Sequence, residues 1–339
     1  MRLDDIGEFG LIERIRRSFA APSQRAPIGI GDDAAALCVS PGHTLLATTD
    51  MLVEGVHFDL ATTDLYSLGW KSAAVNLSDI AAMGGTPRFC MTALAIPRRI
   101  TVERIAAFYR GLHAIARKHG VVLVGGDTCS SKRDLVISIA MLGEARRKKI
   151  VTRSGARPGD LVYVTGTLGD SGAGLELVRS SKSGNLRQKT DVRKLIERHL
   201  RPVPRVAWGR MLAESGSVSA MIDVSDGLSS DLGHLCEESG VGAEITGDRI
   251  PLSRSLRRAT GLRQNILDYA LSGGEDYELL FTVPPRREKT IPGFGIDATN
   301  IGVVTKGRSL RFIDDMGSVR LLQASGYDHF KVSRRGRAR

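Results

Sequence analysis

Aspartates recur along this chain beside glycines and hydroxyl side chains, a setting typical of sites that hold cations through oxygen ligands. The densest case is I-D-V-S-D-G-L at residues 222–228, which follows a short hydrophobic run. Asp223 and Asp226 stand three residues apart, and Ser225 and Gly227 permit a tight turn between them. The two carboxylates can therefore bind one cation or two neighbouring cations. The alternative is that Asp226 only caps the helix predicted to follow.

Other segments place acids in the same setting. They are G-I-G-D-D-A at 29–34, T-T-D at 48–50, N-L-S-D at 76–79 and G-G-D-T at 125–128. The second is predicted to end one strand, and the fourth to follow another. Asp79 shares a polar stripe with Ser72 and Asn76 on a predicted helix over 64–83, and such a stripe usually faces a site or an interface. The aspartates concerned are Asp32, Asp33, Asp50, Asp79, Asp127, Asp223 and Asp226.

If the fold brings these acids together, multivalent cations or positively charged substrate groups have to offset their mutual repulsion. Phosphoryl transfer needs mainly positioning and charge neutralisation, which Mg²⁺ and glycine-rich loops supply. Many acids without a dedicated nucleophile therefore favour metal-dependent phosphate chemistry. The sequence lacks the EF-hand spacing of the commonest calcium module, and a glycosidase needs only two carboxylates.

Two further segments carry chemistry of the same kind. G-T-L-G-D-S-G-A-G at 166–174 is predicted to join a strand to a helix, where backbone N–H groups can hold phosphate oxygens, although no Walker motif follows. S-G-G-E-D-Y-E-L at 272–279 places Glu275 and Asp276 beside paired glycines. Both segments are therefore candidates for the same site.

Length and composition define the class of protein. With 339 residues, 42% hydrophobic and 25% charged, the chain has the composition of a soluble globular protein of two domains. No apolar run approaches the ~20 residues that span a bilayer, and the first ten residues lack a hydrophobic signal core. The four cysteines form no C-x-x-C pair, which favours a reducing cytoplasm over a disulfide framework or a zinc site.

The formal net charge of +11 is spread along the chain, with local clusters at 146–149 and 334–339. Such a charge suits nucleic acid, a membrane surface or anionic small molecules. A basic terminal cluster is more often a solvated tail than a binding element, so we do not expect nucleic acid or membrane partners.

The motifs taken together resemble one family. They are G-I-G-D-D-A at 29–34, T-T-D at 48–50, G-V-H-F at 55–58, N-L-S-D-I-A-A-M-G at 76–84, G-G-D-T at 125–128, T-R-S-G-A-R-P-G-D at 152–160, I-D-V-S-D-G-L at 222–228, S-G-G-E-D-Y-E-L at 272–279 and G-Y-D-H-F at 326–330. In this order and over nearly the whole chain, they resemble the thiamine-monophosphate kinase family, within the superfamily of aminoimidazole ribonucleotide synthetase.

The resemblance implies transfer of the ATP γ-phosphoryl group onto thiamine monophosphate, the last step of thiamine diphosphate biosynthesis. It implies an α/β (α+β) fold of two domains like aminoimidazole ribonucleotide synthetase. A mixed sheet with helices, which binds ATP and Mg²⁺, is expected over 1–145, a C-terminal α/β sandwich over 146–331, and a disordered basic tail over 332–339. It also implies a homodimer whose N-terminal sheets pair into a barrel.

The same resemblance assigns site residues. Several magnesium ions would be held by Asp33, Thr48, Thr49, Asp50, Asp79, Asp127, Asp223 and Asp226. ATP would be contacted by Tyr109, Gly126, Asp127, Arg153 and Ser225. Thiamine monophosphate would be contacted by His57 and Glu275. No dedicated catalytic residue is expected, because a phosphate monoester oxygen is already largely ionised near neutral pH.

The sequence departs from the family at one substrate contact. Some members carry a tryptophan three residues before the tyrosine of G-Y-D-H-F, and this chain has Ala324 there. We hypothesise that Tyr327 supplies the aromatic surface instead.

Related families fit less well. Selenophosphate synthetase would show a reactive cysteine or selenocysteine in its N-terminal loop, but residues 1–31 contain no cysteine. Hydrogenase-maturation relatives end in a cysteine, where this sequence ends in Arg339. Aminoimidazole ribonucleotide synthetase is the enzymatic alternative, and nucleic-acid binding through 334–339 is the non-enzymatic one.

Overall fold

The computed structural model describes residues 5–19, 24–27, 30, 35–180 and 189–322. Several positions and segments singled out above lie outside the described residues: all of G-I-G-D-D-A at 29–34 except residue 30, with Asp32 and Asp33, then Ala324, G-Y-D-H-F at 326–330 with Tyr327, and the basic segment 332–339.

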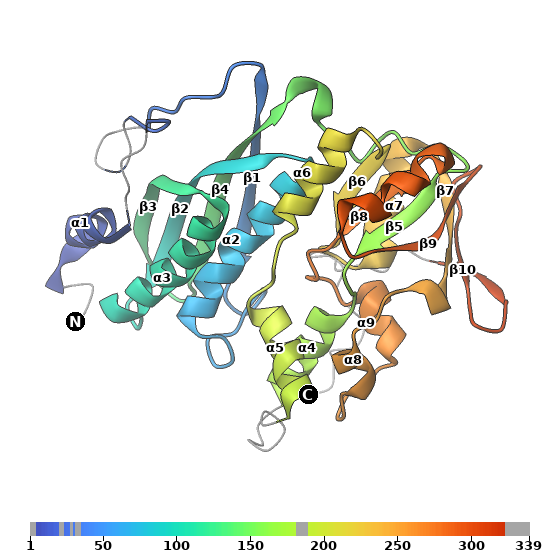
Figure 1. Cartoon of the computed structure of the whole chain (residues 1–339). Helices are drawn as coiled ribbons and strands as arrows, with labels where there is room; N and C mark the ends of the chain where they lie inside the picture. The colour runs from blue at the N-terminus through green and yellow to red at the C-terminus, as the bar shows by residue number, and fades with distance from the viewer. Residues whose placement is uncertain (1–4, 20–23, 28–29, 31–34, 181–188, 323–339) are drawn as a thin grey trace.

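Helices and strands alternate over residues 7–131 and again over 206–246, and elsewhere elements of one type follow one another (Figure 1). The α-helices are α1 (Gly7–Phe19), α2 (Leu65–Ala82), α3 (Val102–His119), α4 (Asp170–Ser180), α5 (Thr190–Leu200), α6 (Val206–Ser215), α7 (Leu228–Ser239), α8 (Arg254–Arg258) and α9 (Ile266–Ser272). The strands are β1 (His43–Val53), β2 (Thr86–Pro97), β3 (Val122–Ser131), β4 (Val136–Arg146), β5 (Leu161–Thr165), β6 (Ala220–Asp223), β7 (Gly242–Thr246), β8 (Leu279–Val283), β9 (Ala298–Thr305), β10 (Leu310–Ile313) and β11 (Val319–Leu321). Short 3₁₀ turns are η2 (Arg147–Lys149), η4 (Gly247–Arg249), η5 (Pro285–Thr290) and η6 (Pro292–Phe294).

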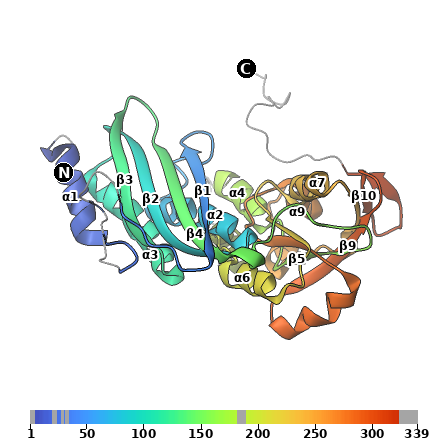
Figure 2. The ribbon, with the colours of Figure 1, turned by 90° about the horizontal axis from the view of Figure 1, so that it is seen from above.

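The first sheet has the strand order β1-β4-β2-β3. Only the β2–β3 pair is parallel, and α3 makes the crossover between these two strands. Helices α2 and α3 cover one face of the sheet (Figure 2). Side chains of β1 alternate accordingly: Leu46 and Leu52 are buried toward the helices, whereas Leu45 and Met51 are exposed on the other face.

Helix α2 lies between the two halves of the molecule. Asp64 caps its N-terminus by accepting a hydrogen bond from the Ser67 amide, and Gly84, at φ 71°, continues the chain in a left-handed turn. Within α2 every residue except Tyr66 and Asp79 is buried. A helix buried all round has to pack on several sides, and the predicted helix over 64–83 is confirmed in this setting.

Two glycines let α2 and α3 approach closely. A Cβ at Gly69 would lie 1.9 Å from the Phe108 carbonyl oxygen, and one at Gly111 would lie 1.8 Å from the Tyr66 carbonyl oxygen. Only glycine fits at these two crossing points, so the pair of helices forms a tight support under the first sheet.

The second sheet has seven strands in the order β11-β10-β7-β9-β5-β8-β6. β10 and β7 are parallel, and the other neighbours are antiparallel. One hydrophobic cluster joins α2 and the first sheet to Tyr163, Met221 and Phe281 of the second sheet. The two sheets therefore share a core around α2 (Figures 1 and 2).

Two strand predictions were too short. T-T-D at 48–50 lies inside β1, and G-G-D-T at 125–128 lies inside β3, rather than at or beyond the strand ends. β1 pairs with β4 through Val53, and β3 pairs with β2 through Ser131. Gly126 is a position of close approach between strands and not a strand end. A Cβ there would lie 2.1 Å from the Thr92 carbonyl oxygen of β2.

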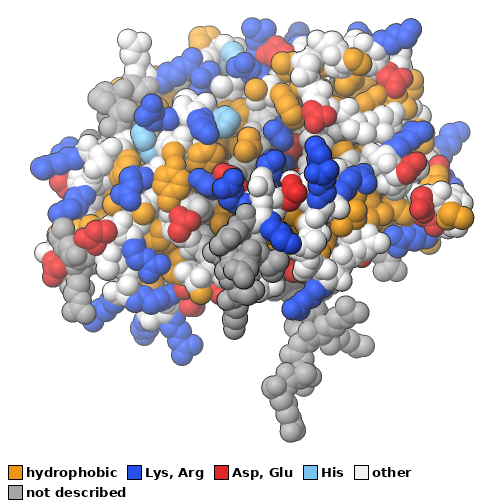
Figure 3. Space-filling model, turned by 60° about the horizontal axis from the view of Figure 1, so that its bottom comes forward, with side chains coloured by type: hydrophobic (Ala, Val, Ile, Leu, Met, Phe, Trp, Pro, Cys, Tyr) orange, Lys and Arg blue, Asp and Glu red, His pale blue; other side chains and the backbone are white. Residues whose placement is uncertain are grey.

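The surface carries its charge in a dispersed pattern. On the face drawn in Figure 3, Lys and Arg side chains are interspersed with Asp, Glu and hydrophobic side chains. In the described part of the chain, no helix combines the length and the hydropathy needed to cross a membrane.

Candidate active site

A cavity of about 690 Å³ opens between the first sheet and the turns that follow β6 and α9. Its walls come from β1, α2, α4 and these two turns, and they include apolar side chains such as Leu52 and Val75. Eight of the residues assigned from the sequence line it: Thr49, Asp50, His57, Asp79, Asp223, Ser225, Asp226 and Glu275. The fold therefore gathers acids from four separate segments at one place.

Three carboxylates form the centre of this cavity, and we call Asp50, Asp79 and Asp223 the open cluster. Asp50 is on the helix-covered face of β1, Asp79 is in the last turn of α2, and Asp223 ends β6. Thr48 donates its hydroxyl to Asp79 Oδ2 at 2.5 Å. Ser78 donates its hydroxyl to Asp223 Oδ2 at 2.6 Å. The end of α2 therefore supplies Asp79 and also contacts Asp223 of the second sheet.

The electrostatics of the open cluster are unfavourable for three bare charges. Burial and then the charge of Asp79 raise the pKa of Asp50 to about 7. Burial and then Asp79 likewise raise the pKa of Asp223 to about 7. Burial also raises the pKa of Asp79, against the opposing effects of the Thr48 hydroxyl and of the exposed Arg153. Bound cations would relieve this repulsion.

The side chains of the open cluster offer only oxygen atoms as ligands. Hard cations such as Mg²⁺ prefer oxygen ligands. Among the described residues, no three His, Cys, Asp or Glu side chains stand close enough to hold one ion by themselves. This arrangement still suits Mg²⁺, because that ion usually takes one or two carboxylates and fills its other positions with substrate phosphate and water.

The turn between β6 and α7 is closed by an acid that the sequence analysis did not single out. Asp231 Oδ2 accepts hydrogen bonds from the amides of Ser225, Asp226 and Gly227, each at 3.1 Å. The N-cap of α7 is Gly227, so the helix-cap alternative for Asp226 is wrong, and Asp226 lines the cavity. Gly227, at φ 108°, supplies the backbone geometry that the turn needs.

Residues 273–278 run beside this turn in an unusual backbone conformation. Glu275 and Tyr277 have φ values of 57° and 52°, which non-glycine residues rarely adopt. The Glu275 amide donates to the Ser225 carbonyl at 2.7 Å, and the Tyr277 amide donates to the Val224 carbonyl at 2.9 Å. Held in this way, Glu275 and Tyr277 line the cavity.

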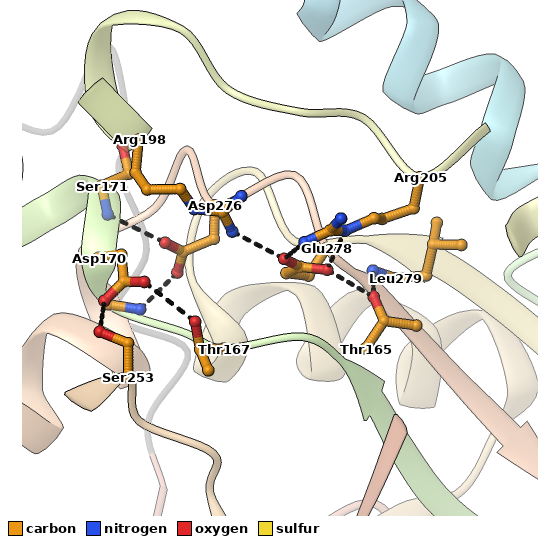
Figure 4. A network of polar contacts seen from close by, with 11 residues as sticks. Thr165, Thr167, Asp170, Ser171, Arg198, Arg205, Ser253, Asp276, Glu278 and Leu279 are labelled. Atoms are coloured by element: carbon orange, nitrogen blue, oxygen red, sulfur yellow. Dashed lines mark hydrogen bonds and ion pairs between the residues drawn. The ribbon is translucent and has the colours of Figure 1, made fainter. Parts of the chain in front are cut away.

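The other two acids of S-G-G-E-D-Y-E-L at 272–279, Asp276 and Glu278, belong to a second group of carboxylates (Figure 4). Asp276 accepts the Gly169 amide at 2.7 Å and the Ser171 amide at 3.1 Å. Glu278 is fully buried and accepts from Arg198 at 2.7 Å and from Arg205 at 2.6 Å, and also from a threonine, Thr165, at 2.7 Å. We call Asp170, Asp276 and Glu278 the closed cluster.

The closed cluster changes the interpretation of G-T-L-G-D-S-G-A-G at 166–174. The amides of Gly169 and Ser171 are occupied by Asp276, so they are not available for phosphate oxygens. Asp170 also accepts from Thr167 and Ser253, at 3.0 and 2.6 Å. This glycine-rich segment therefore anchors the 273–278 turn instead of forming a phosphate loop.

Comparison with known proteins identifies the family. The chain matches the family models AIR synthase related protein, N-terminal domain, over residues 31–145 and AIR synthase related protein, C-terminal domain, over residues 157–315. It is 40% identical over 329 residues to thiamine-monophosphate kinase from Salmonella typhimurium, covering 96% of this chain and 98% of that one. The chain belongs to the thiamine-monophosphate kinase family. The recognition made from the motifs and the enzyme class, a phosphotransferase with a phosphate group as acceptor, are confirmed.

Solved structures of the thiamine-monophosphate kinase family agree with the fold. The crystal structure of thiamine-monophosphate kinase from Stenotrophomonas maltophilia K279a is 38% identical, with a TM-score of 0.79 and coverage of 91% of this chain and 96% of that chain. AaThiL complexed with AMPPCP and TMP is 38% identical, with a TM-score of 0.77 and coverage of 97% and 99%. The predicted α/β fold of the aminoimidazole ribonucleotide synthetase type is confirmed.

Other residues assigned from the family lie away from the cavity. Tyr109 is buried in α3, where its ring stacks on Phe19 at 5.7 Å. Gly126 and Asp127 lie on β3, at the opposite edge of the first sheet from β1. Three strand spacings separate these edges, or about 14 Å. Within one copy of this kinase, Tyr109, Gly126 and Asp127 therefore do not join the open cluster.

Sequence reasoning assigned no role to several residues at or behind the cavity. Leu175, Arg179 and Tyr277 line it, and Lys71 and His199 contact Glu275 from behind. Lys71 had a detectable signal, since it is the one charged residue between 65 and 78. Arg179 and Leu175 come from α4, one helical turn apart, and no local pattern connects them with the acids.

Proposed function

We propose that this protein transfers the γ-phosphoryl group of ATP directly, and in line, to the phosphate of thiamine monophosphate, yielding thiamine diphosphate and ADP. The observation that carries the proposal is the cavity in which the open cluster faces the Glu275 turn, in a chain 38% identical to AaThiL complexed with AMPPCP and TMP. The reaction would be the last step of thiamine diphosphate biosynthesis.

We assign the metal site to oxygen ligands. Several Mg²⁺ ions would be held by Asp33, Thr48, Thr49, Asp50, Asp79, Asp127, Asp223 and Asp226. The raised pKa values of Asp50 and Asp223 support this assignment, because repulsion that destabilises bare carboxylates favours cation binding. When bound, Mg²⁺ supplies charge neutralisation for the reacting phosphates and aligns them.

Of the residues with the other roles, Ser225, His57 and Glu275 line the cavity. ATP would be contacted by Tyr109, Gly126, Asp127, Arg153 and Ser225, and thiamine monophosphate by His57, Glu275 and Tyr327. The His57 ring is fixed, because its Nδ1 accepts the Val53 amide at 3.0 Å. No side chain has to remove a proton from the acceptor phosphate, so the chain's contribution is positioning and exclusion of water.

A homodimer would explain why the β1 side of one face of the first sheet stays exposed, although Ala26 and Leu37 cover part of that face. Leu45 and Met51 are 48% and 57% exposed there, and β1 is an edge strand. Exposed apolar side chains on an edge strand typically mark an interface. Register through β4 and β2 puts Asp127 on the same face as Met51, so two copies paired through this face would bring Asp127 to their contact. A monomer in sedimentation at micromolar concentration would contradict this proposal.

We further propose that 1–145 and 146–331 form the two domains, and that the enzyme works in the cytoplasm. Both proposals rest on the sequence, the second on its cysteine usage. Separate expression of 146–331 that yields no folded protein would contradict the division into independent domains.

A coupled ADP-release assay with ATP and Mg²⁺ tests the function. We expect ADP together with thiamine diphosphate when thiamine monophosphate is the acceptor, and no ADP with free thiamine or with formylglycinamidine ribonucleotide. ADP with the ribonucleotide alone would instead indicate aminoimidazole ribonucleotide synthetase activity. If no ADP forms with any of the three acceptors, both enzymatic functions are contradicted. Salt-sensitive binding of duplex DNA would then support the nucleic-acid alternative.

A further inference from the structure

Lys71 is a buried cation and the one charged residue between positions 65 and 78 of α2. Its side chain is only 2% exposed, and its Nζ lies 2.8 Å from the carboxylate of Glu275. The two residues come from different halves of the molecule, α2 and the turn after α9. An apolar side chain would satisfy the packing of α2 at lower desolvation cost, so the charge at this position is directed at Glu275.

His199 holds the same carboxylate from a second direction. Its Nδ1 lies 3.2 Å from Glu275 Oε2 and 3.1 Å from the Ser171 hydroxyl. Burial and then the charge of Lys71 lower the pKa of His199 to about 3, so the ring is neutral. The ring therefore contacts the Glu275 carboxylate as a neutral polar group and not as a second cation.

Glu275 and Glu278 differ in the exposure of their carboxylates to the cavity. Glu278 is 0% exposed and is enclosed by two arginines and a threonine. Glu275 is 29% exposed and lines the cavity. Although burial opposes ionisation, the charge and the hydrogen bond of Lys71 lower the pKa of Glu275, so it is an anion with one side open to a ligand.

We propose that Lys71 and His199 are positioning residues, which fix the Glu275 carboxylate in one orientation toward the positively charged thiamine moiety of the acceptor. This inference rests on the proposed function. Neither residue lines the cavity, so both act through Glu275. The left-handed backbone at Glu275 and its amide hydrogen bond to Ser225 fix the position of the main chain. Lys71 and His199 fix the position of the carboxylate at the end of the side chain.

Steady-state kinetics of Lys71→Met and His199→Gln test the assignment. We expect the KM for thiamine monophosphate to rise about tenfold in each, as for loss of one hydrogen bond to a charged group. The KM for ATP should stay within about twofold, because the ATP contacts are elsewhere. Lys194→Met is the matched control: it removes an exposed cation from the same helix as His199, and we expect wild-type kinetics.

A double variant separates positioning from support of the fold. Lys71→Met leaves Glu275 without its main partner, so it should lower the melting temperature, and Lys71→Met/Glu275→Gln should recover much of that loss by removing the lone charge. Positioning predicts that the double variant keeps the raised KM for thiamine monophosphate, as Glu275→Gln alone does. Recovery of both stability and KM in the double variant would overturn the proposal.

The remaining outcomes are also decisive. If Lys71→Met does not fold, His199→Gln carries the test, since it replaces one neutral polar side chain by another. Wild-type turnover of thiamine monophosphate with an unchanged KM in His199→Gln would overturn the positioning role alone. Wild-type protein without such turnover would overturn the proposed function itself, and this inference with it.

Discussion

The open and closed clusters are two groups of buried carboxylates in one molecule, and they differ in what surrounds them. In the closed cluster, Glu278 is enclosed by Arg198 and Arg205, and Asp276 by two backbone amides. In the open cluster, Asp50, Asp79 and Asp223 have hydroxyl donors and mainly one another as neighbours.

A raised pKa does not separate the two clusters. Burial raises the pKa of Asp276 to about 7, the same value that burial and neighbouring acids give Asp223. The difference lies in the partners and in access: the closed cluster is satisfied by the protein, and the open cluster lines a cavity. A buried acid therefore marks a binding site only when the protein itself leaves it without sufficient partners.

The largest expected effect distinguishes the clusters by activity. Asp223→Asn should lower kcat by at least about 100-fold, comparable to loss of one group that stabilises a transition state. Its folding stability should be unchanged or higher, because the substitution removes a carboxylate that repels Asp50 and Asp79. Asp248→Asn, an exposed change in η4, should be neutral in both measurements. Near-normal kcat in Asp223→Asn would mean that the open cluster is not the reaction centre.

The closed cluster should respond in the opposite way. Glu278→Gln leaves Arg198 and Arg205 without their carboxylate, and we expect a loss of about 3–5 kcal/mol in the free energy of unfolding, measured by chemical denaturation. Glu197→Gln removes an exposed partner of Arg201 and should cost at most about 1 kcal/mol. Equal stability of the two variants would show that the closed cluster is not structural.

The dependence of stability on pH sharpens the comparison. The pKa of Asp50 and that of Asp223 are each raised from the ordinary value of 3.8 to about 7, so the folded protein binds these protons more tightly than the unfolded chain. Their contribution to stability is fully present below pH 3.8 and is lost as pH rises through 7.

Mg²⁺ should reverse that loss. At 100 times its Kd it should stabilise the protein by about 2.7 kcal/mol, and its effect on the melting temperature should be larger at pH 8 than at pH 6. Thermal-shift curves at pH 6 and pH 8, with and without chelator, measure the stabilisation by Mg²⁺ and its dependence on pH. Asp223→Asn should reduce the Mg²⁺ effect, and an undiminished effect would assign the ion to another site.

The smallest expected effect concerns Arg179 at the cavity wall. This exposed side chain is well placed to attract an anionic phosphate, so Arg179→Gln should raise the KM for thiamine monophosphate about threefold to tenfold, with the difference shrinking in high salt. Arg193→Gln on α5 is the matched control, because it is exposed and lies outside this cavity. A salt-independent change would argue for packing instead of charge.

Local sequence was enough to define several parts of this protein. The helix predicted over 64–83 corresponds to α2, and the order of the acid-bearing motifs identifies the family. Eight of the site residues assigned from the motifs line the cavity. These features depend on residue type and short spacing, which a single chain displays directly.

The tertiary structure alone decided which acids face the cavity and which are enclosed. Glu275, Asp276 and Glu278 stand within four residues, yet the first lines the cavity and the other two bind Arg198, Arg205 and the start of α4. Lys71 and His199 reach Glu275 from positions 204 and 76 residues away in sequence. Such partners are brought together only when the two sheets pack around α2, because the burial that gives each charge its environment is a property of the whole fold.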